Sequence, residues 1–220
     1  MIEYVENKEI IARRIARFFE SGDVVNLGIG LPTMVGNFVP ENVTVILQSE
    51  NGMMGLGPRP EKGMEDKDLT NAGGMPVTVL PGGCFFDSAT SFGIIRGGHV
   101  DYTVLGVLEV DQEGNLANYK IPGKMVPGMG GAMDLVAGSR VVIAATTHLE
   151  KTGASKLKTR CSLPLTAAHE VDIVVTDVGY FTVKDGRFRL AEYFAPYTPE
   201  WIVEHTNADI VVEKDCVEFR

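Results

Sequence analysis

Uninterrupted apolar runs limit what this chain can fold into more than any other feature. RVVIAATT (140–147) and DIVVTDV (172–178) are apolar nearly throughout, and VTVIL (43–47) is a shorter run of the same kind. Strands that are apolar on both faces are typical of parallel sheets covered by helices on both sides. The sequence therefore predicts an α/β fold, with an open, mostly parallel or mixed sheet flanked by helices.

Helix and turn signals separate these runs. We expect helices from an Asn7 cap to a stop at Gly22, near 33–38, from an Asp87 cap through Ile95, over 132–138, and from Thr198 and Pro199 to about 206. Strands are expected at 24–27, 43–48, 76–80, 102–107, 140–147, 172–178 and 210–212, with an Asp185-Gly186 hairpin at a sheet edge. No repeat or linker interrupts the 220 residues, so one domain spanning 1–220 is predicted.

Composition excludes several classes of function. The net charge is -9 without any run of Lys or Arg, which argues against nucleic-acid binding. No segment approaches the roughly 18 apolar residues of a membrane span, and no apolar signal core opens the chain, so a cytoplasmic location is expected. The His and Cys spacing predicts no metal site, and the three cysteines (Cys84, Cys161, Cys216) are interpreted as small buried hydrophobes.

A carboxylate follows the apolar run at 43–47. In QSENGMMGLGP (48–58), Glu50 stands just beyond the predicted strand, with glycines after it. One interpretation makes Glu50 a solvated turn residue, because Asn51-Gly52 is a common hairpin turn. The other makes it a ligand-facing residue, because open α/β sheets bind ligands outside the carboxyl ends of their strands.

If Glu50 faces a ligand, the residues around it in the sequence indicate which reaction it can carry out. No G-x-S-x-G or P-loop motif occurs, and no His, Ser or Cys pattern accompanies Glu50. Glutamate is ionised at neutral pH, so it suits attack on a thioester without a general base. Such a reaction needs backbone N–H donors for the developing oxyanion, each worth roughly 3 kcal/mol.

The loop IPGKMVPGMGGAMDLV (121–136) is the candidate source of these donors. Glycines let the backbone approach a ligand closely, and the helix predicted from Ala132 directs its positive end the same way. Lys120 and Lys124 are candidates for contacts with phosphates. The alternative is a surface loop with ordinary turn glycines and solvated lysines.

A dinucleotide site is the rival interpretation. In NLGIGLPT (26–33), Gly28 and Gly30 follow a strand, and Glu50 lies where a ribose-binding acid would stand. Thr33 occupies the place of the third glycine, and Pro32 restricts the turn that would lead into a pyrophosphate-binding helix. An NAD(P)-binding oxidoreductase therefore stays open as an alternative.

Five segments together carry a family resemblance: SENGMMGLGP, DLTNAGGMPVTVLPGG, FDSATSFGIIRGGHVD, GNLANYKIPGKMVPGMGGAMDLVAG and CSLPLT. In this order, and over nearly the whole chain, they resemble the B (beta) subunit of class I coenzyme A transferases of the 3-oxoacid type. The likeness is greatest to the branch that handles acetoacetate, butyrate, acetate or succinate. It implies the CoA-transferase fold.

The resemblance also implies roles for particular residues. Glu50 corresponds to the nucleophile, which passes through an acyl-glutamyl anhydride and a glutamyl-CoA thioester. Gly130 and Gly131 match the glycine loop near the thioester. Together with Gly30, Asn51 and Ala132 they are the predicted substrate-binding residues.

Cofactor and partner expectations follow from the same resemblance. Coenzyme A takes part as a substrate, and no permanently bound cofactor or metal is expected. An A (alpha) subunit is expected as partner, in an A2B2 assembly. A 3-oxoadipate or succinate:3-oxoacid CoA-transferase, a thioesterase and a non-catalytic subunit remain alternatives.

Overall fold

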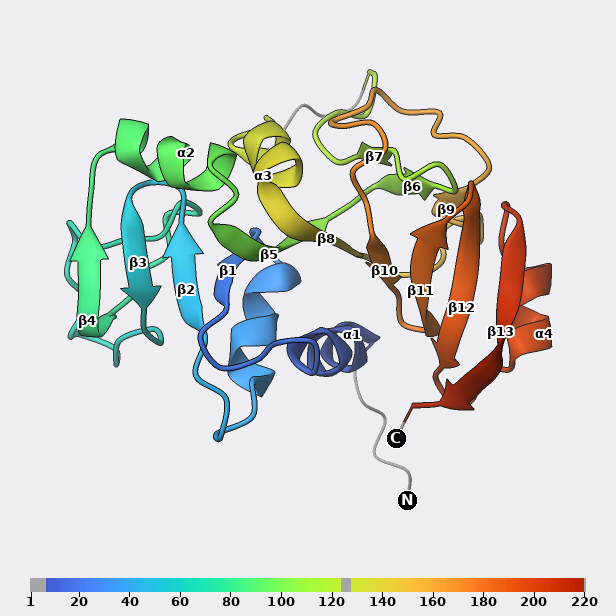
Figure 1. The fold of residues 1–220 in the computed structure, drawn as a ribbon, viewed down its shortest axis with the longest axis horizontal. Helices are drawn as coiled ribbons and strands as arrows, with labels where there is room; N and C mark the ends of the chain where they lie inside the picture. The colour runs from blue at the N-terminus through green and yellow to red at the C-terminus, as the bar shows by residue number, and fades with distance from the viewer. Residues whose placement is uncertain (1–6, 124–127, 220) are drawn as a thin grey trace.

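A ten-stranded mixed sheet runs the length of the molecule (Figure 1). The structure, a computed structural model, describes residues 7–123 and 128–219. The strand order is β13-β12-β11-β10-β8-β5-β1-β2-β3-β4. The strands are β1 (Val24–Leu27), β2 (Ile46–Ser49), β3 (Met53–Leu56), β4 (Val79–Phe85), β5 (Val100–Gly106), β8 (Ser139–Ala145), β10 (Ile173–Val175), β11 (Gly179–Lys184), β12 (Arg187–Tyr193) and β13 (Ile210–Glu218).

Five adjacent strands in the middle of this sheet, β2, β1, β5, β8 and β10, are parallel. Antiparallel pairs flank them on both sides. The α/β fold with a mixed, mostly parallel centre is therefore confirmed. Since parallel strands point the same way, their carboxyl ends form one edge of the sheet, which is the usual location of ligand sites.

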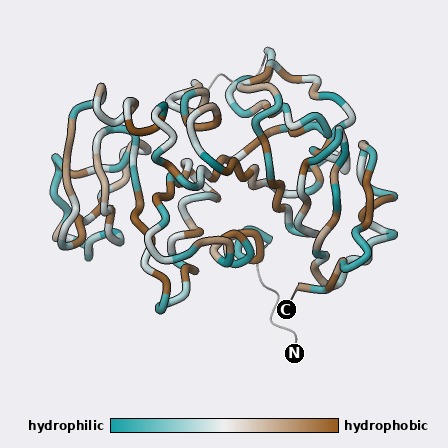
Figure 2. The backbone as a smooth tube through the Cα atoms, in the orientation of Figure 1, coloured by the Kyte–Doolittle hydropathy of each residue, from teal (hydrophilic) through white to brown (hydrophobic). Residues whose placement is uncertain are grey.

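Helices cover both faces of the central strands (Figure 1). Helix α1 (Asn7–Ala16) and the 3-10 helix η1 (Pro32–Phe38) pack on one face, and α2 (Ser88–Arg96) and α3 (Ala132–Gly138) pack on the other. Neighbouring residues of β5 belong to different cores: Val104 lies in the core that contains Ile15 of α1, and Leu105 lies in the core that contains Leu135 of α3. This double burial explains the uninterrupted apolar runs, which form the hydrophobic centre in Figure 2.

A second, three-stranded sheet, β7-β6-β9, contains β6 (Glu109–Asp111), β7 (Leu116–Ala117) and β9 (Leu157–Lys158). The sequence did not predict these strands, because the segment around them is polar and rich in turn residues. Two buried carboxylates in this small sheet accept hydrogen bonds from the backbone of a later segment. Glu109 accepts hydrogen bonds from the backbone of Ser162 and Leu163, and Asp111 accepts one from Cys161.

Several local predictions are confirmed. Asp87 caps α2 by accepting from Thr90 N at 2.7 Å, and Thr198 caps α4 (Pro199–Glu204). The Asp185-Gly186 turn has positive φ at both residues, 53° and 66°, as a two-residue hairpin requires. The edge location was wrong, since β13 pairs with β12 and forms the edge itself.

Other predictions were wrong for identifiable reasons. The strand expected at 76–80 is β4, which includes Pro81; a proline is tolerated there because β4 is an edge strand. Helix α1 ends at Ala16, before Gly22, and Asn7 donates its amide to Asp177 at 2.7 Å. None of the cysteines is fully buried: Cys84 is exposed on β4, and Cys161 and Cys216 are half-buried.

None of the helices within 7–123 and 128–219 has both the length and the apolar character needed to cross a bilayer.

Candidate active site

Glu50 lies in the tight turn of the β2–β3 hairpin. The turn closes through a 3.0 Å hydrogen bond from Gly52 N to Ser49 O, and Ser49 pairs with Met53 across the hairpin. Gly52 has φ +113°, and a Cβ atom placed there would lie 2.0 Å from the carbonyl oxygen of Phe86. Only glycine fits this position, because both the backbone conformation and the contact exclude a side chain.

This turn sits at the carboxyl edge of the parallel strands. Glu50 directly follows β2, one residue closer to the strand end than the sequence predicted, and it is half-buried. Glu50 thus lies in a hairpin turn, as the first interpretation has it, and its ligand-facing role stays a prediction. The hairpin turn places a carboxylate at the carboxyl edge of the parallel strands, where open α/β sheets usually bind ligands.

The predicted glycine loop meets Glu50 in space. A Cβ atom placed on Gly131 would lie 3.4 Å from Glu50 Cγ and 3.3 Å from the Phe92 ring. Gly131 immediately precedes α3, and its carbonyl accepts from Leu135 N at 2.9 Å. Gly130 has φ +53°, a conformation that favours glycine. The packing of α2 against α3 therefore brings this backbone beside the carboxylate.

Ala132 has a different environment from the two glycines. Its N–H donates to Met129 O at 3.2 Å, and its side chain is buried. Its predicted role in substrate binding stays a prediction. Lys120 is half-buried after β7, whereas Lys124 lies outside the described residues.

Asn51 anchors a second loop beside the turn. Its Nδ2 donates to Thr70 O at 2.8 Å, and Ala72 N donates to the Ser49 hydroxyl oxygen at 3.0 Å. The bridge between Thr70 and Pro76 makes 70–76 a narrow hairpin-like loop. The position of this loop beside Glu50 was not expected from the sequence, although its Asn-Ala-Gly-Gly run is a recognisable turn signal. The substrate role of Asn51 stays a prediction.

Gly30 lies in the exposed loop after β1, with φ +89°. This loop contacts 70–76, since a Cβ atom on Gly73 would lie 3.1 Å from Ile29 Cγ1. The chain then enters the 3-10 helix η1, not an α-helix. The dinucleotide interpretation requires an α-helix whose first N–H groups hold a pyrophosphate, and this segment lacks one.

A buried polar row lies under Glu50, on the sheet face covered by α2. Asn26 Nδ2 donates to Gln48 Oε1 at 2.7 Å, and Gln48 Nε2 donates to the Ser91 hydroxyl at 3.1 Å. Among the described residues, Asn26 Oδ1 and the Thr103 hydroxyl have no hydrogen-bond partner. Each unpaired buried polar atom lowers the stability of the folded state by roughly 1–3 kcal/mol, so this row destabilises the fold next to the Glu50 turn.

A cysteine nucleophile or a metal centre is a weaker candidate than Glu50. Burial raises the pKa of the Cys161 thiol, and the nearby Asp111 and Glu109 raise it further, so the thiol stays protonated. Within the described part of the chain, no three His, Cys, Asp or Glu side chains are grouped to hold a metal. Glu50 is the candidate that combines location, half-burial and adjacent glycine backbone.

Comparison with known proteins identifies the family. The family model for coenzyme A transferase matches residues 8–205. The chain belongs to the coenzyme A transferase family. It is 53% identical to the acetate CoA-transferase subunit beta of Haemophilus influenzae, over 97% of this chain and 95% of that protein. It is 56% identical to the subunit of the same name from Escherichia coli, over 86% of each chain.

A solved structure agrees with the fold. The acyl-CoA transferase apoenzyme of Escherichia coli superposes with a TM-score of 0.76 at 22% identity, covering 98% of this chain. This chain spans 43% of that protein, less than half of its length. The resemblance to a coenzyme A transferase B subunit is confirmed, and with it a CoA-transferring enzyme in place of an oxidoreductase.

Proposed function

We propose that this chain is the catalytic B subunit of a short-chain acyl-CoA:carboxylate CoA-transferase, with Glu50 as the covalent nucleophile. The observation that carries the proposal is the proximity of Glu50 and Gly131 at the carboxyl edge of the sheet, where a Cβ atom on Gly131 would lie 3.4 Å from Glu50 Cγ. It puts an anionic nucleophile beside glycine backbone, of which Gly131 is buried and Gly130 is exposed. The acetate substrate in the names of two relatives supports a short-chain acid.

The first half of the proposed reaction charges Glu50 with CoA. A Glu50 carboxylate oxygen attacks the acyl-CoA carbonyl, the C–S bond breaks, and an acyl-glutamyl anhydride and CoA thiolate form. The thiolate then attacks the glutamyl carbonyl. The anhydride C–O bond breaks, which releases the donor carboxylate and leaves a glutamyl-CoA thioester.

The second half reverses these steps with a new acid. The acceptor carboxylate attacks the glutamyl thioester and displaces CoA thiolate, which then attacks the acceptor acyl carbonyl. The new acyl-CoA leaves, and Glu50 returns as a carboxylate. Every nucleophile and leaving group is already an anion, so no His or Ser base is needed.

An N–H group of the 130–131 backbone is the proposed oxyanion donor, worth roughly 3 kcal/mol of transition-state stabilisation. Each intermediate hydrolyses if water enters, so the half-exposed Glu50 needs a cover. We assign the cover to an A subunit, since the relatives are themselves named as beta subunits. The A2B2 stoichiometry and the cytoplasmic location belong to this proposal.

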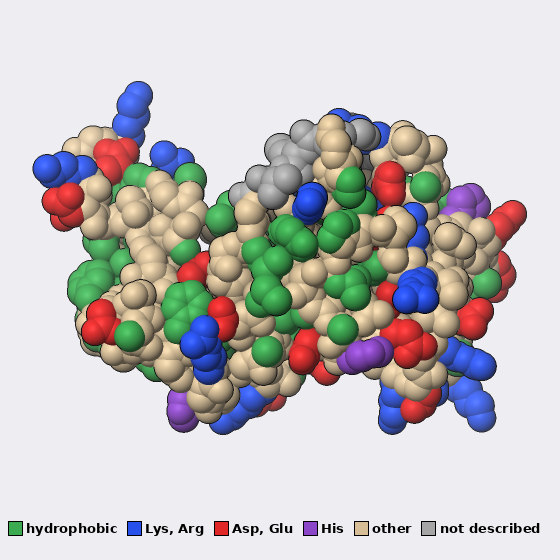
Figure 3. All heavy atoms as spheres, turned by 90° about the horizontal axis from the view of Figure 1, so that it is seen from above, with side chains coloured by type: hydrophobic (Ala, Val, Ile, Leu, Met, Phe, Trp, Pro, Cys, Tyr) green, Lys and Arg blue, Asp and Glu red, His purple; other side chains and the backbone are tan. Residues whose placement is uncertain are grey.

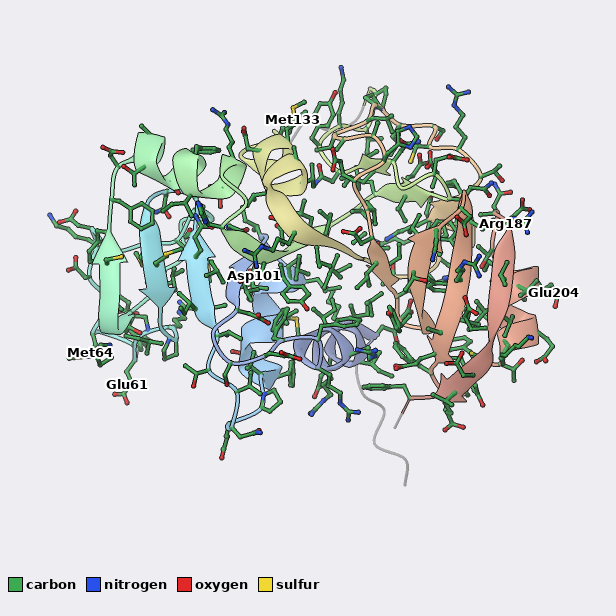
Figure 4. All side chains as sticks on the ribbon, in the orientation of Figure 1. Glu61, Met64, Asp101, Met133, Arg187 and Glu204 are labelled. Atoms are coloured by element: carbon green, nitrogen blue, oxygen red, sulfur yellow. The ribbon has the colours of Figure 1, made fainter. Side chains whose placement is uncertain are left out.

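Borohydride trapping tests the proposal directly. The chain, co-expressed with its A partner, is exposed to acyl-CoA and then to borohydride, and the reduced residue is located by peptide mass spectrometry. The expected product is an alcohol at Glu50 only. A Glu61→Gln variant, altered in the connection between β3 and β4 (Figure 4), should label normally, whereas Glu50→Gln should not. Label at another residue, or full exchange by Glu50→Ala, would contradict the assignment.

A panel of donors and acceptors addresses the substrate. Acetate, butyrate, acetoacetate, succinate and 3-oxoadipate are compared as acceptors, with acyl-CoA loss and acyl-CoA formation measured together. A transferase forms one new acyl-CoA for each one consumed. Loss of acyl-CoA without an acceptor would instead indicate a thioesterase.

A further inference from the structure

A chain of hydrogen bonds ties the strand that leads to Glu50 to the helix that packs over it. Asn26 on β1 pairs in register with Gln48 on β2. Gln48 Oε1 accepts from Asn26 Nδ2 at 2.7 Å, and Gln48 Nε2 donates to the Ser91 hydroxyl of α2 at 3.1 Å. Helix α2 lies over the carboxyl end of β2 (Figure 1). We call the bond between Gln48 and Ser91 the Gln48 brace.

Each end of the Gln48 brace lies next to a part of the candidate site. Gln48 precedes Glu50 by two residues, and side chains two residues apart along a strand point to the same face of the sheet. Ser91 directly precedes Phe92, whose ring lies 3.3 Å from a Cβ atom placed on Gly131. The brace therefore sets the spacing between the strand that leads to Glu50 and the helices α2 and α3, which hold Gly131 in place.

The brace is rigid because it is buried. Gln48 is 3% exposed and Ser91 is fully buried. The side-chain amide of Gln48 is bonded at its oxygen and at its nitrogen, so any rotation of the amide leaves a polar atom unpaired away from water. Such a network holds its members in one arrangement.

Stability does not explain why this row is polar. Asn26 and Thr103 pair in register on β1 and β5, and both are at most 1% exposed. Among the described residues, neither Asn26 Oδ1 nor the Thr103 hydroxyl has a hydrogen-bond partner. Apolar side chains of the same shape would fill this space without leaving polar atoms unpaired. Departures of this kind from core packing are typical of functional sites.

We propose that Gln48 is a positioning residue for the transfer reaction, and that it acts on Glu50 through the brace to Ser91. Gln48 takes no part in making or breaking bonds. The brace keeps the Glu50 turn at one distance from the Gly131 backbone, so the attacking oxygen stays beside the proposed oxyanion donor. This inference rests on the proposed function for the reaction, whereas the effect on the location of Glu50 does not depend on it.

Ser91→Ala tests the proposal, since it breaks the brace by removing one hydroxyl and alanine suits a helix. In the complex with the A partner, it should lower kcat about 10- to 100-fold, the order expected when a reacting group is misplaced by up to about 1 Å. The rate at which borohydride-trappable thioester forms at Glu50 should fall by the same factor. Calorimetric affinity for coenzyme A should stay unchanged, because the brace does not contact the substrate.

Further variants separate positioning from folding. Gln48→Met should lower kcat by at least as much as Ser91→Ala, and the double variant should lose no more than Gln48→Met alone, because both changes remove one bond. Ser91→Thr keeps the hydroxyl and should recover most of the rate. Ser88→Ala, at an exposed position of the same helix, is the matched control and should change nothing.

Crystal structures of the wild-type and Ser91→Ala complexes provide a measurement that needs no activity, and the Glu50 carboxylate should lie farther from Gly131 in the variant. Three results would overturn the inference: an unchanged kcat with a lower melting temperature, which makes the row structural only; a fall in kcat matched by weaker binding of coenzyme A; or an unmoved Glu50. A wild-type complex that never forms a thioester at Glu50 would instead contradict the proposed function, and the two crystal structures would still decide whether the brace positions Glu50.

Discussion

Glu50 and Gly131 lie next to each other at the carboxyl edge of the sheet: a Cβ atom on Gly131 would lie 3.4 Å from the Cγ atom of Glu50. One residue belongs to a hairpin turn and the other to the start of α3. Their proximity brings the proposed nucleophile and the proposed oxyanion donor together. Figure 3, viewed from above, shows hydrophobic side chains gathered over the middle of the molecule. Met133, two residues after Gly131, is exposed and projects from α3 (Figure 4).

Gly131→Ala should reduce CoA transfer far more than stability. The added methyl group would press on Glu50 Cγ and on the Phe92 ring at 3.3 Å, so the carboxylate must shift. Misplacing a reacting group by about 1 Å can cost on the order of 100-fold in rate. Steady-state transfer assays measure this loss. Gly93→Ala is the control: it lies inside α2 with nothing within 4 Å, so it should keep full activity and melt no lower.

Gly52→Ala should destabilise the β2–β3 hairpin. Its methyl group would lie 2.0 Å from Phe86 O, and φ is +113°. Gly63→Ala isolates the conformational part, because Gly63 also has positive φ, +91°, but nothing within 4 Å. We expect about 1 kcal/mol for Gly63→Ala and several times more for Gly52→Ala, measured by urea unfolding. Equal losses would mean that the Phe86 contact relaxes freely.

Gln48→Leu should cost about 2–3 kcal/mol in the free energy of unfolding. It leaves the amide of Asn26 and the hydroxyl of Ser91 buried without their present partner. Adding Asn26→Leu should recover part of the loss, because both polar groups are then removed. A double-mutant cycle in urea provides the coupling energy. Strict additivity of the two single losses would show that the row is not a unit.

Stability should fall as the pH drops from about 6.5 toward 4 because of His148. Its side chain is fully buried, and burial lowers its pKa to about 4 from the ordinary 6.5. In this window the unfolded chain binds a proton that the folded chain does not, so acid favours unfolding. The loss reaches up to about 3 kcal/mol and is complete near the folded pKa. Above pH 6.5 this contribution is fully present.

Chemical unfolding at several pH values between 5 and 7 measures this slope. His148→Gln removes the titrating group and should flatten the dependence in that range, whatever its own stability at pH 7. An unchanged slope in His148→Gln would assign the pH dependence to other groups.

Local features of the fold were predictable from the sequence. The apolar runs specified the buried strands β8 and β10, and the caps at Asp87 and Thr198 and the Asp185-Gly186 turn form as expected. Each depends on a few neighbouring residues, whose backbone conformation and hydrogen bonds are set locally. The edge strands were less predictable: β4 includes a proline and two glycines, and it forms because β3 offers it a pairing partner.

Glu50 as a candidate nucleophile came from sequence alone, through its place after an apolar run and its motif. The residues that surround Glu50 could not be predicted from the sequence. The approach of Gly131, the loop at 70–76 bound to Ser49 and Asn51, and the polar row beneath Glu50 join segments far apart along the chain. Their meeting depends on strand order and helix packing, which are decided when the two cores are buried together, since no local pattern encodes those distances.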